Sequence, residues 1–122
     1  MKPDWWLKKW EALFCEQEIG YSITSKNKSV VFCGDNTEES LPDIMCLAKN
    51  CDLLILDCGQ IKPGNGHLTP TLAGQIAQAA QVKKLLLTHF YPEMEKIDIK
   101  KIVKKYYSGP IILAKDLMKI KI

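Results

Sequence analysis

The 122-residue sequence contains no arginine, so all 17 of its Lys and Arg residues are lysines. This absence excludes recognition of phosphate or base edges by the planar fork of a guanidinium. The sequence also contains neither a G-x-G-x-x-G fingerprint nor a P-loop, and its "CGDNTEES" stretch resembles neither of them. Nucleotide binding through those two loops is therefore not expected.

Cysteine is present in an odd number, five, and no two cysteines form a C-x-x-C pair. A disulfide framework and a zinc site with the usual cysteine spacing are both disfavoured by that pattern. Several of the cysteines lie inside apolar segments, so we expect reduced, buried thiols in a reducing compartment.

Long apolar runs are missing as well, and no stretch of about 18 apolar residues suggests a transmembrane helix. The first residues, "MKPDWWLKKWEALF", are charged throughout and have no apolar signal core. We therefore expect a cytoplasmic protein with no membrane partner.

What is present fits one domain of ordinary globular composition, with a net charge of +3. Five lysines are spaced as on a helix, which indicates either the solvated face of that helix or a phosphate-binding patch. Nucleic acid thus remains a possible but weakly supported partner. The lysines are Lys96, Lys100, Lys101, Lys104 and Lys105.

Residues 1–17 are predicted to form an amphipathic helix, because aromatic and apolar residues such as Trp6 and Trp10 recur at helical spacing. Its aromatic stripe would pack on the rest of the fold or cover a partner chain. Further along, strands are predicted at "GYSIT", "SVVFCG", "CDLLILDC", "VKKLLLTH", "PIILA" and "LMKIKI". Helices are predicted at "EESLPDIMCLAKN", after the Thr69–Pro70 start signal, and at "KIDIKKIVKKYY". The alternation of strands and helices predicts an α/β fold with a largely parallel sheet.

Chemically useful side chains follow the predicted parallel strands. Asp35, Asp57 and His89 come at strand ends, and His67 lies in the loop after the strand that ends at Asp57. Because ligands bind at the carboxyl ends of strands in open α/β sheets, we expect these residues to converge. Imidazole and carboxylate suit Zn²⁺ or a similar divalent ion.

Each of these residues also has an ordinary alternative. Asp35 would cap a helix or turn, Asp57 would accept hydrogen bonds from loop amides, His67 would be a loop residue without a task, and His89 would be a surface histidine. The residue chemistry alone leaves these alternatives open.

The segments "VVFCGDN", "CDLLILDC", "GHLTPTLAGQIA", "VKKLLLTHFYPE" and "IILAKDLMKIKI" together resemble the C-terminal half of the metallo-β-lactamase superfamily, closest to its ribonuclease Z-like branch. The resemblance implies an α/β fold that is half of an αββα sandwich, a mixed sheet flanked by helices. It divides the chain into an N-terminal helix, residues 1–17, and a half-domain, residues 18–122.

The resemblance also implies roles for three residues. Asp35 would bridge two metal ions, His89 would bind one of them, and His67 would assist the leaving group. The ions would be Zn²⁺, or else Mn²⁺ or Fe²⁺, and the substrate a phosphodiester or related ester, attacked by a hydroxide held between the ions.

The sequence departs from the family at its main metal signature, H-x-H-x-D-H, which is absent. Tyr, Ser or Asn would replace imidazole poorly at zinc. Where tRNA-processing members show His-Glu-Ala-Thr, this chain has "LDCG", residues 56–59. We therefore expect a metal-dependent hydrolase half, inactive or weak alone, completed by an N-terminal half or a second copy. The alternative is a non-catalytic interaction module or homodimer that keeps the fold without the full metal site.

Overall fold

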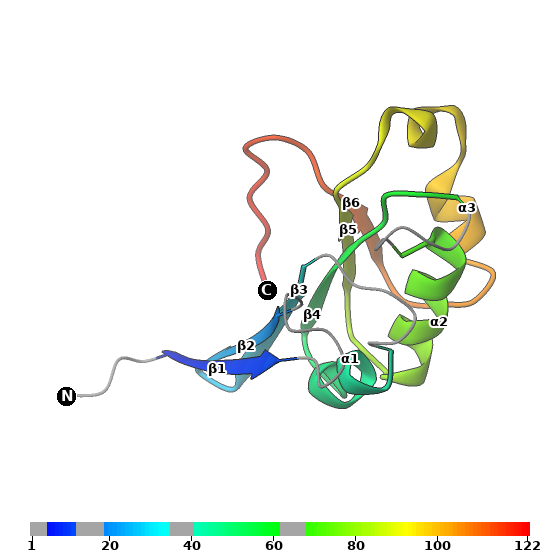
Figure 1. Cartoon of the computed structure of the whole chain (residues 1–122). Helices are drawn as coiled ribbons and strands as arrows, with labels where there is room; N and C mark the ends of the chain where they lie inside the picture. Colours follow the sequence, from blue (N-terminus) through cyan, green and yellow to red (C-terminus); the bar gives the residue numbers. More distant parts are fainter. Residues whose placement is uncertain (1–4, 12–18, 35–40, 62–67) are drawn as a thin grey trace.

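The computed structural model describes residues 5–11, 19–34, 41–61 and 68–122, which form one mixed sheet of six strands with helices (Figure 1). The strands lie in the sheet in their chain order, β1 to β6. The pairs β1–β2 and β2–β3 are antiparallel, and every pair from β3 to β6 is parallel. The predicted α/β class and largely parallel sheet are confirmed. The strands are β1 Trp5–Glu11, β2 Ile19–Ser25, β3 Lys28–Cys33, β4 Leu53–Asp57, β5 Leu85–Thr88 and β6 Ile111–Leu113.

The helices connect the parallel strands. They are α1 Leu41–Ala48, α2 Pro70–Ala79, the 3₁₀ helix η2 Pro92–Lys96, and α3 Ile99–Val103. The predicted start of α2 is confirmed, because the Thr69 hydroxyl accepts the backbone N–H of Leu72 at 3.2 Å and Pro70 occupies the first turn. Asp98 caps α3 in the same way, accepting the N–H of Lys101 at 3.1 Å.

One face of the sheet forms the hydrophobic core with the helices, which lie together on that side in Figure 1. Alternate residues of the parallel strands point into this core, among them Val31, Leu54, Leu56, Leu85 and Leu87, all fully buried.

Two buried polar contacts link segments distant in sequence. The Tyr107 hydroxyl donates to the Val82 carbonyl at 2.9 Å, and its ring lies against Gly109. Asp52, just before β4, accepts the Ser29 N–H at 2.8 Å and pairs with Lys83 at 3.1 Å. Both contacts satisfy polar groups that would otherwise be costly to bury.

The opposite face of the sheet carries a second row of apolar side chains. The strand pairing places Tyr21, Phe32, Ile55, Leu86 and Ile112 side by side across β2 to β6. None belongs to the core under the helices, and Phe32 is 41% exposed. The C-terminal segment after β6 returns along this side, and the Lys84 ammonium donates to the Lys121 carbonyl at 3.3 Å (Figure 1). We call these five residues the second-face row.

The predicted N-terminal helix is wrong over residues 5–11, which form strand β1. Trp6 and Trp10 are four residues apart, a spacing shared by one face of a helix and one face of a strand. Antiparallel pairing with all seven residues of β2 decides in favour of the strand. Residues 1–4 and 12–17 lie outside the described part, and the boundary between residues 17 and 18 stays a prediction.

Two predictions near the C-terminus also need correction. The stretch "LMKIKI", residues 117–122, alternates like a strand but forms none, because the chain turns at Leu117 with a positive φ of 59°. The helix predicted over "KIDIKKIVKKYY" is only the five residues of α3, since Asp98 caps a new start after η2. In the described ranges, no helix has the length and apolar character needed to cross a membrane.

Candidate functional site

Strands β3 to β6 run parallel, so their carboxyl ends meet at one edge of the sheet. At this edge β3 ends at Cys33, β4 at Asp57 and β5 at Thr88, with His89 the next residue. Asp57 and Thr88 are register partners, and the Cys58 N–H donates to the Thr88 carbonyl at 2.8 Å. The predicted convergence of Asp57 and His89 on one edge of the sheet is therefore confirmed.

Asp35 and His67, the other two predicted site residues, lie outside the described residues. Their described neighbours reach the same edge of the sheet. Gly34 directly follows β3, and the backbone N–H of Leu68 donates to Oδ2 of Asp57 at 3.3 Å. Leu68 itself is fully buried. The roles of Asp35 and His67 stay predictions.

Asp57 accepts a hydrogen bond from a loop amide, which is the structural role that the sequence offered as the alternative to a functional one. The carboxylate is only 2% exposed and holds the chain at Leu68, just before α2. Its negative charge acts on neighbouring thiols: burial, reinforced by Asp57, raises the pKa of Cys58 to about 12. Asp57 is thus a structural anchor of the edge on which the proposed site would be built.

The buried cysteines have the properties that the sequence predicted. Cys33, Cys51 and Cys58 are free and buried, and Cys46 is free and exposed, while Cys15 lies outside the described residues. Burial raises the pKa of Cys33 to about 12, with smaller contributions from Cys51 and Asp57. Metals and electrophiles take the thiolate, so these protonated thiols are poor ligands in the free chain.

His89 has an uncommon backbone conformation. Its φ of 64° lies in the left-handed region, which strains a residue with a Cβ atom. The side chain is exposed, and its ring centroid lies 5.7 Å from that of Tyr91, at an interplanar angle of 52°. Five other non-glycine residues in the described part of the chain also have a positive φ, so this conformation leaves both readings of His89 open.

The side chains available to bind a divalent metal ion are few. Within the ranges that the structure describes, no group of three His, Cys, Asp or Glu side chains could hold an ion. The whole sequence contains two histidines. Catalytic zinc sites use at least three protein ligands per ion, so this donor set does not by itself fit a dinuclear centre.

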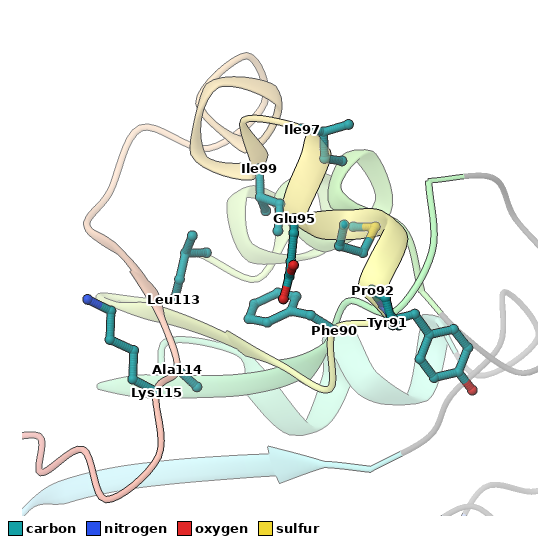
Figure 2. Close-up of a pocket in the computed structure, with 10 residues that line it drawn as sticks. Phe90, Tyr91, Pro92, Glu95, Ile97, Ile99, Leu113, Ala114 and Lys115 are labelled. Carbon is teal, nitrogen blue, oxygen red and sulfur yellow. The ribbon is translucent and has the colours of Figure 1, made fainter.

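The five lysines near α3 are all exposed, which fits both the solvated face and the phosphate-binding patch that their spacing indicates. Sequence reasoning missed a pocket of about 520 Å³ that begins at Phe90 and is closed by Leu113 and Lys115 (Figure 2). Its lining comes from two separate segments, residues 90–99 and 113–115, so no local pattern in the sequence indicates it.

Comparisons with known proteins agree with this architecture. Residues 14–90 match the family model of the β-lactamase superfamily domain. The ribonuclease Z of Microcystis aeruginosa is 36% identical over 96 residues, 74% of this chain and 27% of that protein. The ribonuclease Z of Brevibacillus brevis is 40% identical over 77 residues, 58% of this chain and 24% of that protein. The chain thus spans about a quarter of the length of these two curated relatives.

A solved structure extends the agreement to the fold. The metallo-β-lactamase fold protein YhfI from Bacillus subtilis matches with a TM-score of 0.79 and 25% identity, over 94% of this chain and 48% of that one. The family model covers more than half of the sequence, and the fold matches over nearly all of it. The chain therefore belongs to the metallo-β-lactamase superfamily, and it corresponds to part of that domain.

Proposed function

We propose that this chain supplies one half of a dinuclear hydrolase site that cleaves phosphodiesters or related esters. Asp35 and His89 are the metal ligands of this half. His67 protonates, or hydrogen-bonds to, the oxygen that departs. The ions, Zn²⁺ or else Mn²⁺ or Fe²⁺, supply a Lewis acid and a hydroxide at neutral pH when they are bound.

One observation carries this proposal: the described residues next to all three proposed site residues reach a single edge of the sheet. His89 follows β5, Gly34 follows β3, and Leu68 is tied to Asp57 at the end of β4. The exposed side chain of His89 supports the proposal, because it is accessible to a ligand at that edge. The ribonuclease Z relatives support a phosphodiester as the substrate.

The shortage of ligands indicates that the site is completed by another polypeptide segment. The second-face row favours the same conclusion, since a sheet with apolar residues on both faces packs against something on each. The partner is an N-terminal half of the same fold or a second copy of the chain. We propose that the completed site acts in the cytoplasm.

The test combines metal content with hydrolysis of bis(4-nitrophenyl) phosphate. The full chain is assayed alone and together with the N-terminal half of the Bacillus subtilis fold relative, at stoichiometric Zn²⁺ or Mn²⁺. We expect weak metal binding and little turnover alone, and turnover with the added half. Asp35→Asn and His89→Ala should abolish that gain, because each removes a ligand.

Lys119→Ala is the matched control, since Lys119 is exposed and lies away from the edge of the sheet. It should leave turnover unchanged. Full activity of the lone chain with stoichiometric zinc would contradict the incomplete site. Absence of turnover in every mixture, with the two halves shown to associate, would contradict the hydrolase itself.

The second-face row also favours a second candidate, a non-catalytic interaction module or homodimer. In that case the chain would form a stable dimer by light scattering, and Phe32→Lys would dissociate it. Replacing both Asp35 and His89 with alanine would leave the dimer and every other measured behaviour unchanged. A metal-dependent gain of activity on mixing would instead favour the hydrolase.

Nucleic acid as a partner rests on the exposed lysines near α3. Phosphate contacts by lysine weaken steeply as salt is raised. RNA binding that changes little between about 50 and 200 mM salt would exclude this use of the lysines.

A further inference from the structure

The pocket of about 520 Å³ lies between the segment that follows β5 and strand β6. Its volume falls in the range of about 300–1,000 Å³ that is usual for small-molecule sites. Most of its wall is apolar: Phe90, Ile99 and Leu113 lie around its centre in Figure 2. Met94 and Ile99 are buried, so this wall is fixed by the core.

Among the described residues, two charged side chains line the pocket, and they occupy different places. Glu95 points toward the middle of the pocket in the view of Figure 2, whereas Lys115 lies at the border beside Ala114. Glu95 is exposed, so its carboxylate is available to accept a hydrogen bond from a donor group of a ligand in the pocket. The lysine at the border favours an anionic group at the other end of that ligand.

The pocket and the proposed site are neighbours along the chain. Phe90, the first lining residue, directly follows His89 at the end of β5.

We propose that this pocket binds the base of a nucleotide that carries an exocyclic amino group. The base stacks on Phe90, its amino group donates to Glu95, and its phosphate pairs with Lys115. This assignment rests on the proposed function in one respect: if the chain is half of a phosphodiester hydrolase, the bound nucleotide is part of its substrate.

The chemistry of the three side chains selects this ligand class. An aromatic ring stacks on any base, and an acidic side chain accepts from the amino group of cytosine. Uracil differs from cytosine by a carbonyl oxygen in place of that amino group. An oxygen facing the Glu95 carboxylate would leave two acceptors opposed, which selects against uracil.

The test measures binding of cytidine and uridine monophosphates to the full chain by calorimetry, in the presence of a metal chelator. Neither turnover nor a bound ion is needed, so failure here is distinct from failure of the hydrolase proposal. We expect cytidine monophosphate to bind about tenfold tighter than uridine monophosphate. Ribose 5-phosphate, which lacks a base, should bind weakest.

Glu95→Gln should remove most of the preference for cytosine, and Lys115→Met should weaken both nucleotides by a similar factor that shrinks as salt is raised. Both side chains are exposed enough for these changes to leave the fold intact. Glu93→Gln, an exposed acid of the same 3₁₀ helix outside the pocket, is the matched control and should change nothing.

Equal binding of the two nucleotides, or binding of ribose 5-phosphate as tight as that of either, would overturn the proposal. So would a preference for cytosine that survives Glu95→Gln. Phe90→Leu gives an independent measurement, because it keeps apolar volume and removes the stacking face. It should weaken both nucleotides, and unchanged affinity would contradict the placement of the base.

Discussion

The left-handed backbone at His89 makes an unusual prediction about glycine. Glycine normally destabilises a protein relative to alanine because it loses more backbone freedom on folding, by about 0.5–1 kcal/mol. At His89, φ is 64°, where a residue with a Cβ atom is disfavoured by about 1–2 kcal/mol. The difference leaves His89→Gly more stable than His89→Ala by about 0.5–1 kcal/mol.

Comparison of these two variants isolates the backbone, because both lose the imidazole and its ring contact with Tyr91. Urea denaturation measures the free energy of unfolding of each, and the thermal midpoints should differ by about 2–5 °C. Lys100 in α3 provides the control, since it is exposed on an ordinary helix. There the alanine variant should be the more stable, by about 1 kcal/mol.

If glycine were the less stable residue at both positions, His89 would not be strained in solution. If glycine is favoured at position 89 while the same change removes metal binding, the natural histidine is kept there at the expense of stability, as expected for a ligand.

Three further predictions concern the rest of the fold. Asp52→Asn should destabilise the chain by about 1 kcal/mol. The Ser29 N–H and Lys83 hold the pKa of Asp52 below its usual range, so the stability that Asp52 provides is present above about pH 4 and lost below it. In urea titrations at acid pH, the difference in unfolding free energy between Asp52→Asn and the natural chain should therefore vanish. Iodoacetamide at pH 8 should label Cys46 in the native chain but not the three buried thiols. Mass spectrometry of tryptic peptides measures the labelling of each cysteine, and equal labelling of all four would refute the burial of the three. Gly109→Ala should cost about 2–4 kcal/mol in urea denaturation, because the new Cβ would overlap the Tyr107 hydroxyl and would break its hydrogen bond to the Val82 carbonyl. A cost under 1 kcal/mol would show that the ring moves freely.

The parts of the fold that the sequence predicted well are those fixed by local signals. The Thr69–Pro70 start of α2 and the turn between β2 and β3, at Lys26 and Asn27, are examples. Both depend on residues within a few positions of one another. The continuous apolar run of β4 likewise predicts a strand that is buried on both faces, and this prediction does not depend on which strands lie beside it.

The errors arise where a distant partner decides the structure. Nothing inside the first seventeen residues shows that β2 offers an unpaired edge to residues 5–11, so the helical spacing of Trp6 and Trp10 was misleading. At the site, strand order alone brought Asp57 and His89 to one edge. The pocket was not predictable, because Glu95 and Lys115 come to line one pocket only when β6 pairs with β5.

The apolar row that includes Phe32, on the face of the sheet away from the helices, links the behaviour of this chain to its concentration. If association covers that side, the folded state is stabilised by mass action, and the melting temperature rises as more protein or more of the complementary partner is added. A cell that produces this polypeptide would then set its lifetime through the supply of its binding counterpart as much as through its own interior packing.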